Sequence, residues 1–214
     1  MRLTDRSTTV RPRVKPALDT KHRLLEAANE LIWTQSYGSV SVDDICAKAD
    51  VRKGSFYHFF PSKSDLAVAA IEECWQQSRE WLDKIFSTQN PPLERIEQYC
   101  AAVYEHQKEK AKKIGKVCGC PFASLGSEQS TLDEPIRQKG KEIFNRMDKY
   151  LETTLRDAAR EDLIGKTDSA AAARDVLALV EGILLEAKVQ NDLEIIKRLK
   201  PAVFRFLGIS QHVK

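Results

Sequence analysis

The stretch Ser41-Val-Asp-Asp-Ile-Cys-Ala-Lys-Ala-Asp-Val-Arg-Lys-Gly-Ser-Phe-Tyr-His-Phe-Phe-Pro-Ser-Lys63 decides the fold of this 214-residue chain. Apolar residues recur at helical spacing through its first part, at Val42, Ile45, Cys46 and Ala49. Asp50 then begins a break before a second short helix over residues 53–60. The pattern predicts a helix, a tight turn and a second helix.

The second of these helices is expected to have two different faces. Steps of about 100° per residue put three aromatic rings on one face: Phe56, Phe59 and Phe60. The opposite face carries Gly54, Tyr57 and His58. One face can therefore enter a core, while the other is free to meet a partner.

The free face suits phosphate, because cations and ring donors follow one another along it and no acidic residue lies between Arg52 and Ser64. Gly54 lets the backbone approach a partner closely, and the helix N-terminus adds amide donors. This is the physics of a helix-turn-helix that enters a DNA major groove. A solvated basic helix on any α-helical protein remains the alternative.

Residues 19–66 resemble the DNA-binding domain of TetR/AcrR-type transcriptional regulators. The resemblance rests on four segments: Leu24–Ala28, Tyr37–Gly38, Ser41–Ala49 and Val51–Lys63. Where that family most often has Ser at position 52 and Leu at position 56, this chain has Arg52 and Phe56. We therefore interpret Arg52 as a candidate base reader peculiar to this protein.

The candidate DNA-contacting residues are Ser41, Arg52, Lys53, Gly54, Ser55, Tyr57, His58 and Lys63. Ser41 also stands where an N-cap is expected, and we predict capping as its main role. The resemblance implies that a residue at this position also contacts phosphate. Residues 1–18 contain Arg2, Arg6, Arg11, Arg13 and Lys15. This flexible basic arm either follows the minor groove or is an untethered tail with nonspecific affinity.

Composition favours a soluble globular protein, with 42% hydrophobic and 30% charged residues. The net charge of +3 is concentrated in residues 1–66, which hold 11 Lys and Arg against 8 Asp and Glu, as expected for a nucleic-acid contact. No secretory signal and no apolar run of about 18 residues occurs, so we expect a cytoplasmic protein that does not cross a membrane. Five cysteines, an odd number, predict reduced thiols.

Helical periodicity continues through the remainder of the chain and predicts an all-α protein of about nine helices. The predicted division is a basic arm (1–18), a three-helix helix-turn-helix DNA-binding domain (19–63) and a larger helical ligand-binding and dimerisation domain (64–214). Ser62 to Asp65 has the spacing of a capping box and starts a long helix that runs to about Phe86. Pro121 is expected near the first turn of a short helix.

Residues 169–189 are apolar on more than one face, so a helix there needs cover on two sides. The family resemblance implies that this helix and a final helix over 192–207 form a four-helix bundle with their mates in a homodimer. Gly182 would let such helices approach closely. A monomer that buries both faces internally is the alternative.

The resemblance also implies a pocket in the second domain for a small-molecule inducer. Two recognition helices must lie about 34–36 Å apart to fit successive major grooves, and a ligand that favours another spacing releases the operator. The pocket candidates are Trp75, Trp81, Tyr104, Cys118, Phe122, Phe144 and Met147. Core packing is the alternative for each of them, and the aromatic enrichment favours an apolar or planar inducer.

The segment Cys118-Gly119-Cys120-Pro121 is the most distinctive outside the helix-turn-helix. Three cations precede it in the sequence: Lys112, Lys113 and Lys116. They and a helix start at Pro121 would stabilise a thiolate, so a cysteine-based redox or electrophile sensor using Cys118 and Cys120 competes with buried structural thiols. A metal site that adds His106 lacks a fourth ligand at recognisable spacing, so neither metal nor cofactor is expected.

No Gly-rich phosphate loop, HExxH or G-x-S-x-G motif is present, and the four His residues are scattered, so no enzyme is expected. The sequence therefore predicts a regulator that binds a double-stranded DNA operator, a repressor released by its unidentified inducer. Within the DNA-binding class, an activator or a nucleoid-type protein is the alternative. Outside it, the alternative is a helical small-molecule binding protein or enzyme with an incidental basic helix.

Overall fold

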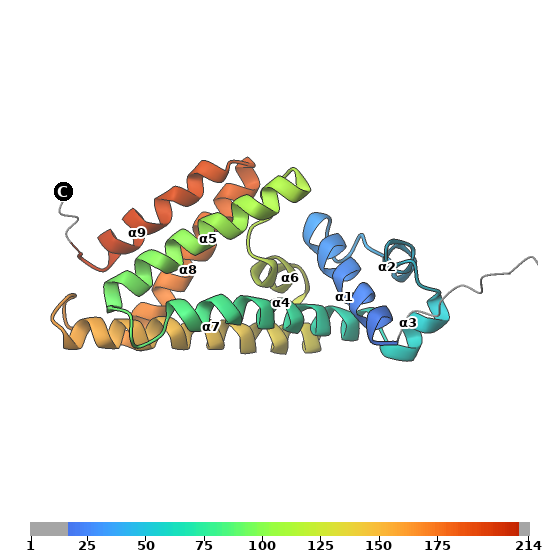
Figure 1. The fold of residues 1–214 in the computed structure, drawn as a ribbon, viewed down its shortest axis with the longest axis horizontal. Coiled ribbons are helices and arrows are strands. Elements are labelled where there is room, and N and C mark those ends of the chain that lie inside the picture. Colours follow the sequence, from blue (N-terminus) through green and yellow to red (C-terminus); the bar gives the residue numbers. More distant parts are fainter. Residues whose placement is uncertain (1–16, 210–214) are drawn as a thin grey trace, which may run out of the picture.

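A computed structural model describes residues 17–209, and this part of the chain folds into nine α-helices and one 3₁₀-helix (Figure 1). The first helices form a unit at one end of the molecule: α1 (Ala17–Thr34), α2 (Val42–Ala49) and α3 (Lys53–Phe59). The others are α4 (Lys63–Ile85), α5 (Pro92–Ile114), α6 (Pro121–Gln129), α7 (Glu134–Arg160), α8 (Ser169–Gln190), η1 (Leu193–Arg198) and α9 (Leu199–Phe206). The predicted all-α fold is confirmed. Of the predicted basic arm, residues 1–16 lie outside the described residues, and residues 17 and 18 already belong to α1.

The start and end of α2 follow from local chemistry. Ser41 caps the helix, because its hydroxyl accepts a hydrogen bond from the Asp44 amide while the Asp44 carboxylate accepts one from the Ser41 amide at 2.8 Å. Asp50 ends the helix in the left-handed conformation, with φ of 52°. The predicted capping role of Ser41 and the break at Asp50 are therefore confirmed.

The first three helices and the start of α4 share a small hydrophobic core. Its fully buried side chains include Leu24, Ala28, Ile45, Phe56 and Leu66. We call α1, α2 and α3 together the reading head. Outside the apolar contacts, the Arg23 guanidinium on α1 donates to the carbonyl of Ala49 at 2.6 Å, which fastens α1 to the end of α2.

Helix α4 belongs to two cores, because Leu66 and Ala70 pack in the reading head while Trp75 and Leu82 pack in the second domain. It begins where Ser62 accepts a hydrogen bond from the Asp65 amide, as the capping pattern predicts. Figure 1 shows α4 running from the reading head along the length of the molecule beside α7. The orientation of the reading head is therefore tied to the packing of α4.

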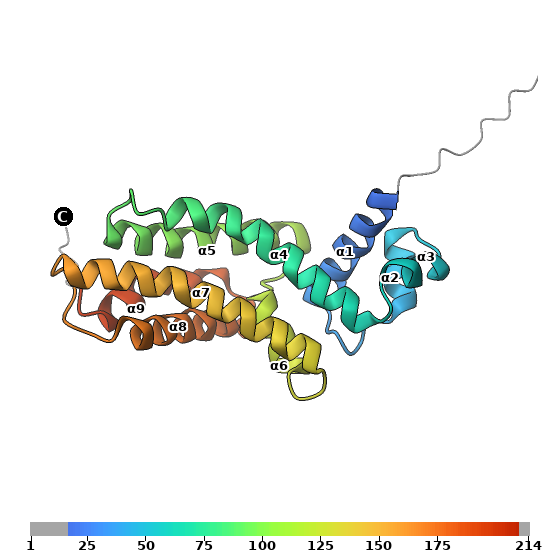
Figure 2. The same cartoon turned by 90° about the horizontal axis from the view of Figure 1, so that it is seen from below.

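The second domain is a bundle in which α5 lies beside α4, and α8 lies beside α7 (Figure 2). Arg95, at the start of α5, is 3% exposed and pairs with Asp157 near the end of α7 at 2.7 Å. This ion pair, with Arg95 buried and Asp157 half-buried, joins the start of α5 to the last turns of α7.

The final helix differs from the prediction. Residues 192–207 were expected to form one helix, but the chain passes through η1 before α9 begins. Pro201 has no N–H to bond the carbonyl of Lys197, so a continuous α-helical ladder is interrupted at this junction.

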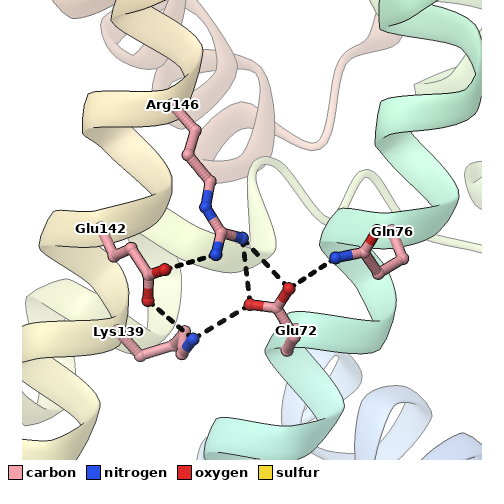
Figure 3. A network of polar contacts seen from close by, with 5 residues as sticks. All are labelled: Glu72, Gln76, Lys139, Glu142 and Arg146. Carbon is pink, nitrogen blue, oxygen red and sulfur yellow. Dashed lines mark hydrogen bonds and ion pairs between the residues drawn. The ribbon is translucent and has the colours of Figure 1, made fainter.

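A network of charges joins α4 to α7 at the level just beyond the reading head (Figure 3). The Glu72 carboxylate on α4 accepts from Lys139 Nζ at 3.0 Å and from Arg146 Nη1 at 3.0 Å, both on α7. Glu142 bonds the same two cations, and Gln76 also donates to Glu72. Burial alone would raise the pKa of Glu72, but the hydrogen bonds from its three donors lower it overall.

We expect Glu72→Gln to lower the free energy of unfolding by about 1 kcal/mol, since the partly exposed network loses its shared anion. The melting temperature should fall by about 2–4 °C. A carboxyl with a lowered pKa contributes stability that is present above its ordinary value of 4.5 and is lost as the pH falls through the lowered value. The difference in melting temperature between wild type and variant should therefore shrink as the pH falls below 4.5.

Glu105→Gln is the matched control, because Glu105 pairs with Lys108 in an exposed contact within α5 alone. We expect that change to cost less than about 0.5 kcal/mol. A loss for Glu72→Gln no larger than this at neutral pH would show that the network does not hold α4 against α7.

Candidate nucleic-acid interface and ligand cavity

Helix α3 has the two faces that its sequence predicts. Phe56 and Phe60 are buried in the reading head and Phe59 is half-buried. The opposite face is open, with Tyr57 half exposed and with a Cβ built on Gly54 meeting no atom within 4 Å. Arg52, Lys53 and His58 are also exposed, and Ser55 is half-buried at the border.

Two cations stand at the start of this open face. Arg52 is the N-cap residue of α3, and its guanidinium forms no ion pair within the described part of the chain. Lys53 pairs with Asp43 on α2 at 2.9 Å, an exposed contact that a phosphate can replace. Ser41 is exposed at the N-terminus of α2. These groups form a candidate DNA interface.

Lys63 is not free in the way its sequence position suggests. Its ammonium donates to the carbonyls of Tyr37 and Val40, both at 2.9 Å, and lies 4.0 Å from the centre of the Tyr37 ring. Burial lowers the pKa of Lys63. In this conformation the residue closes the turn between α1 and α2 with two of its three N–H donors, and its predicted phosphate contact stays a prediction that would use the third.

A cavity of about 230 Å³ lies among α4, α5, α6, α7 and α8. Four of the predicted pocket residues line it: Trp75, Trp81, Phe122 and Met147. Trp81 stacks on Tyr99 with ring centres 6.3 Å apart and lies 4.7 Å from the ring of His106. We call this space the aromatic cavity.

The other three predicted pocket residues do not line the aromatic cavity. Tyr104 lies beside the ammonium groups of Lys108 and Lys197 on the other side of α5. Phe144 packs half-buried against the core, and Cys118 is buried in the loop before α6. Helical periodicity shows which residues turn inward, but it does not show which inward residues border empty space.

A second space of about 840 Å³ lies between α1 and the helices α4, α6 and α8. We call it the α1–α8 groove. Four residues border both spaces: Trp33, Cys120, Pro121 and Glu181. Sequence reasoning missed Glu181, although a single carboxylate within the apolar run Val176–Leu185 was a visible signal.

Of the two alternatives for Cys118 and Cys120, burial favours structural thiols over activated ones in this conformation. Burial raises the pKa of Cys118 even though Lys188, Lys110 and Lys116 oppose it, and Lys112 and Lys113 are not among its neighbours of consequence. Burial and the adjacent Glu181 raise the pKa of Cys120 further. A raised pKa favours the protonated, less nucleophilic form of each thiol in this conformation. Residues 17–209 also contain no cluster of His, Cys, Asp and Glu suited to a metal ion.

The cavity is connected to the reading head through α6 and the loop before it. The Glu128 carboxylate on α6 accepts hydrogen bonds from the amides of Tyr37 at 3.0 Å and Gly38 at 2.7 Å, which lie in the turn before α2. The Trp33 indole on α1 donates to the Gly119 carbonyl at 3.2 Å. Gln107 holds the same glycine by bonds to both its N–H and its carbonyl.

An apolar stripe on α8 is left uncovered within the described chain. Ala178, Gly182, Leu185 and Val189 recur along one side of the helix and are all exposed, with Val189 at 77%. Phe206 on α9 is 48% exposed. Among the helices of residues 17–209, none is long and apolar enough to cross a membrane.

Two family descriptions match the chain. "Bacterial regulatory proteins, tetR family" covers residues 24–70, which contain the reading head, and "Tetracyclin repressor-like, C-terminal domain" covers residues 92–203. The chain is 31% identical over 182 residues to an uncharacterized HTH-type transcriptional regulator in the lacX 3' region of Lactococcus lactis, covering 84% of this chain and 88% of that protein. It is 30% identical to the transcriptional regulator AcuR of Cereibacter sphaeroides, covering 84% and 82%.

A solved structure, that of the regulatory protein TetR from Rhodobacter sphaeroides, superposes with a TM-score of 0.78 at 26% identity, over 87% of this chain and 98% of that one. Three observations point to one family: the helix-turn-helix with its open basic face, the helical second domain and these matches. The chain belongs to the TetR family of DNA-binding transcriptional regulators.

Proposed function

We propose that this regulator is a repressor that binds its operator as a homodimer and is released by a small, apolar or planar inducer. The observation that carries the proposal is the double role of α6, which lines both the aromatic cavity and the α1–α8 groove and also holds the turn ahead of α2 through Glu128. An inducer that moves α6 must therefore move or release part of the reading head. A dimer seated on a promoter excludes polymerase by occupying the same DNA.

The open face of α3 supports DNA contact by two kinds of group. Arg52, at the start of the helix with no internal partner among the described residues, is suited to a bidentate bond with a guanine edge. Lys53, Tyr57 and His58 are suited to phosphate oxygens, together with the exposed backbone at Gly54. Ser41 and Ser55 are proposed to complete this surface from its borders.

The apolar stripe on α8 supports the homodimer. Exposed apolar residues at successive helical turns favour burial against another surface, and a second copy offers the same stripe about a two-fold axis. Gly182 carries no side chain in the middle of the stripe, so two copies of α8 can pack closely there. We propose that α8 and the segment η1–α9 form the four-helix interface.

A cysteine-based sensor receives less support than an inducer pocket. Burial raises the pKa of both Cys118 and Cys120, and a thiol sensor needs an accessible thiolate. The aromatic cavity, in contrast, needs no chemical change in the protein to accept a ligand. We therefore propose reversible binding as the signal.

Measurements of DNA binding should distinguish the roles of the two cations of the interface, Arg52 and Lys53. Arg52→Ala should cost about 1–3 kcal/mol and relax the preference at one base pair, because a base contact carries sequence information. Lys53→Ala should weaken binding to all sequences and reduce the slope of log K against log salt by about 1. Fluorescence anisotropy with operator DNA over a salt series measures both.

Lys84→Ala is the control for this pair, since Lys84 is an exposed cation at the far end of α4. Its removal changes the net charge equally but should leave the operator affinity and the salt slope unaltered. An equal loss at every base pair for Arg52→Ala would make Arg52 a phosphate contact instead.

Leu185→Glu combined with Val189→Glu should convert the dimer to a 24.3 kDa monomer, because four carboxylates would face one another across the two-fold axis. Sedimentation velocity at micromolar concentration measures the mass. Leu132→Glu, at a residue 78% exposed in the turn before α7, is the control and should remain dimeric. A wild-type protein that sediments at 24.3 kDa contradicts the dimer.

Glu128→Gln should uncouple the cavity from the reading head, since an amide cannot accept both backbone N–H bonds as the carboxylate does. We expect roughly tenfold more effector to be needed for operator release, with operator affinity in its absence little changed. Glu109→Gln, at an exposed carboxylate on α5, is the control. An unchanged effector response in Glu128→Gln would remove this contact from the signalling route.

A further inference from the structure

Among the described residues 17–209, Glu181 is the one acidic side chain that borders the aromatic cavity. Both of its carboxylate oxygens are shielded from solvent, and within that part of the chain they have no hydrogen-bond partner other than the weak thiol donor of Cys120 beside them. Such a group is costly to keep, because an ionised carboxylate loses its hydration on burial and gains nothing in return unless it is paired. A position used only for packing would be filled better by an apolar side chain of similar size.

The surrounding charges do not explain Glu181. Two ammonium groups belong to residues that border the two spaces, but each has another contact: Lys110 lies 4.6 Å from the centre of the Trp33 ring, and Lys188 donates to the Ser124 hydroxyl at 3.0 Å. No ion pair joins either to Glu181 in the described chain. Burial raises the pKa of Glu181 to about 7, while the neighbouring Cys120 thiol partly opposes this.

Aromatic rings form a large part of the wall of this cavity: Trp33, Trp75, Trp81, Tyr99, His106 and Phe122. Trp75 and Trp81 line the same cavity as Glu181. Trp81 stacks on Tyr99, and the ring centres of Trp75 and Phe122 lie 6.4 Å apart. Aromatic faces carry negative charge density and attract a cation, and their edges and faces also stack with a planar ring. A buried carboxylate and several indole and phenyl rings in one cavity are therefore complementary to a planar molecule that carries positive charge.

We propose that the aromatic cavity binds an aromatic cation of about two fused rings, with its charged nitrogen against Glu181 and its ring plane among Trp75, Trp81 and Phe122. The inference rests on the proposed function in taking this ligand class as the effector. The cation supplies the partner that the carboxylate lacks, and the carboxylate in turn becomes fully ionised when the cation binds. Glu181 also borders the α1–α8 groove and the Cys120–Pro121 start of α6, so its ligand is placed next to the route to the reading head.

The test uses three probes of nearly the same shape: the 1-methylquinolinium cation, its uncharged isostere 1-methylnaphthalene, and the anion 1-naphthoate. Binding to the full-length protein without DNA is measured by quenching of tryptophan fluorescence and by calorimetry. We expect the cation to bind at least tenfold more tightly than the neutral isostere and the anion to bind most weakly. Equal binding of cation and isostere by the wild type, or tightest binding of the anion through Lys110, would overturn the proposal.

Glu181→Gln keeps the shape of the side chain and removes its charge. We expect the variant to lose at least tenfold in affinity for 1-methylquinolinium while 1-methylnaphthalene binds within about twofold of the wild type, which also shows that the cavity is intact. Glu186→Gln, on the same helix but paired with Arg198 outside both spaces, is the control and should change neither. A variant that keeps the cation preference would show that Glu181 does not recognise charge.

The ligand class of the cavity and the role of that ligand as effector can be contradicted by different results. If the cation binds through Glu181 but never alters operator binding, the ligand class stands and its role as effector fails. If operator DNA is released by other compounds while 1-methylquinolinium shows no preference over its isostere, the proposed function stands and the ligand class fails.

Discussion

The structure depends on the packing of α4 in two hydrophobic cores at once. Leu66 and Ala70 bury one end of the helix in the reading head, and Trp75 and Leu82 bury the next turns in the second domain. Between them, Glu72 ties the helix to Lys139 and Arg146 on α7 (Figure 3). Backbone hydrogen bonds hold the turns of a continuous helix in fixed positions, so a tilt of α4 would displace the reading head that packs against its first turns.

Helix α6 provides a second connection between the second domain and the reading head, besides α4. The aromatic cavity lies between α4 and α6. Trp75 of α4, Phe122 of α6 and Glu181 of α8 all reach this one space, while Glu128 continues from α6 to the turn that precedes α2. The proposed ligand would contact both α4 and α6, because residues of both helices line the cavity. The physical requirement for regulation is a difference in ligand affinity between two positions of α4 and α6, and these contacts are where such a difference can arise.

The reading head was predictable from sequence because its signals are local. The positions of Val42, Ile45 and Ala49, the cap at Ser41 and the break at Asp50 each follow from helical spacing or backbone chemistry within a few residues. The second domain was predictable only in part. Four of seven pocket candidates line the aromatic cavity, because a side chain that faces inward borders either a neighbour or a void, and sequence spacing does not distinguish them.

The other differences arise from contacts between distant segments. Lys63 bonds the carbonyls of Tyr37 and Val40, and no local pattern shows that the loop would fold back onto it. Sequence alone left activated and buried structural thiols as alternatives, and burial is the largest cause of the raised pKa of each thiol in the folded chain. Glu181 borders a cavity only in the folded chain, because residues of α4, α6 and α8 together line that space. Such features depend on tertiary packing, which lies beyond helical periodicity.

Paired operator recognition can be measured by selecting bound sequences from a pool of random duplex DNA with the full-length protein and then determining the mass of the complex on the selected site. The account predicts two inverted half-sites about 34–36 Å apart along the helix axis, occupied by an even number of chains. A pool without an enriched sequence, or a single half-site occupied by one chain, would contradict it.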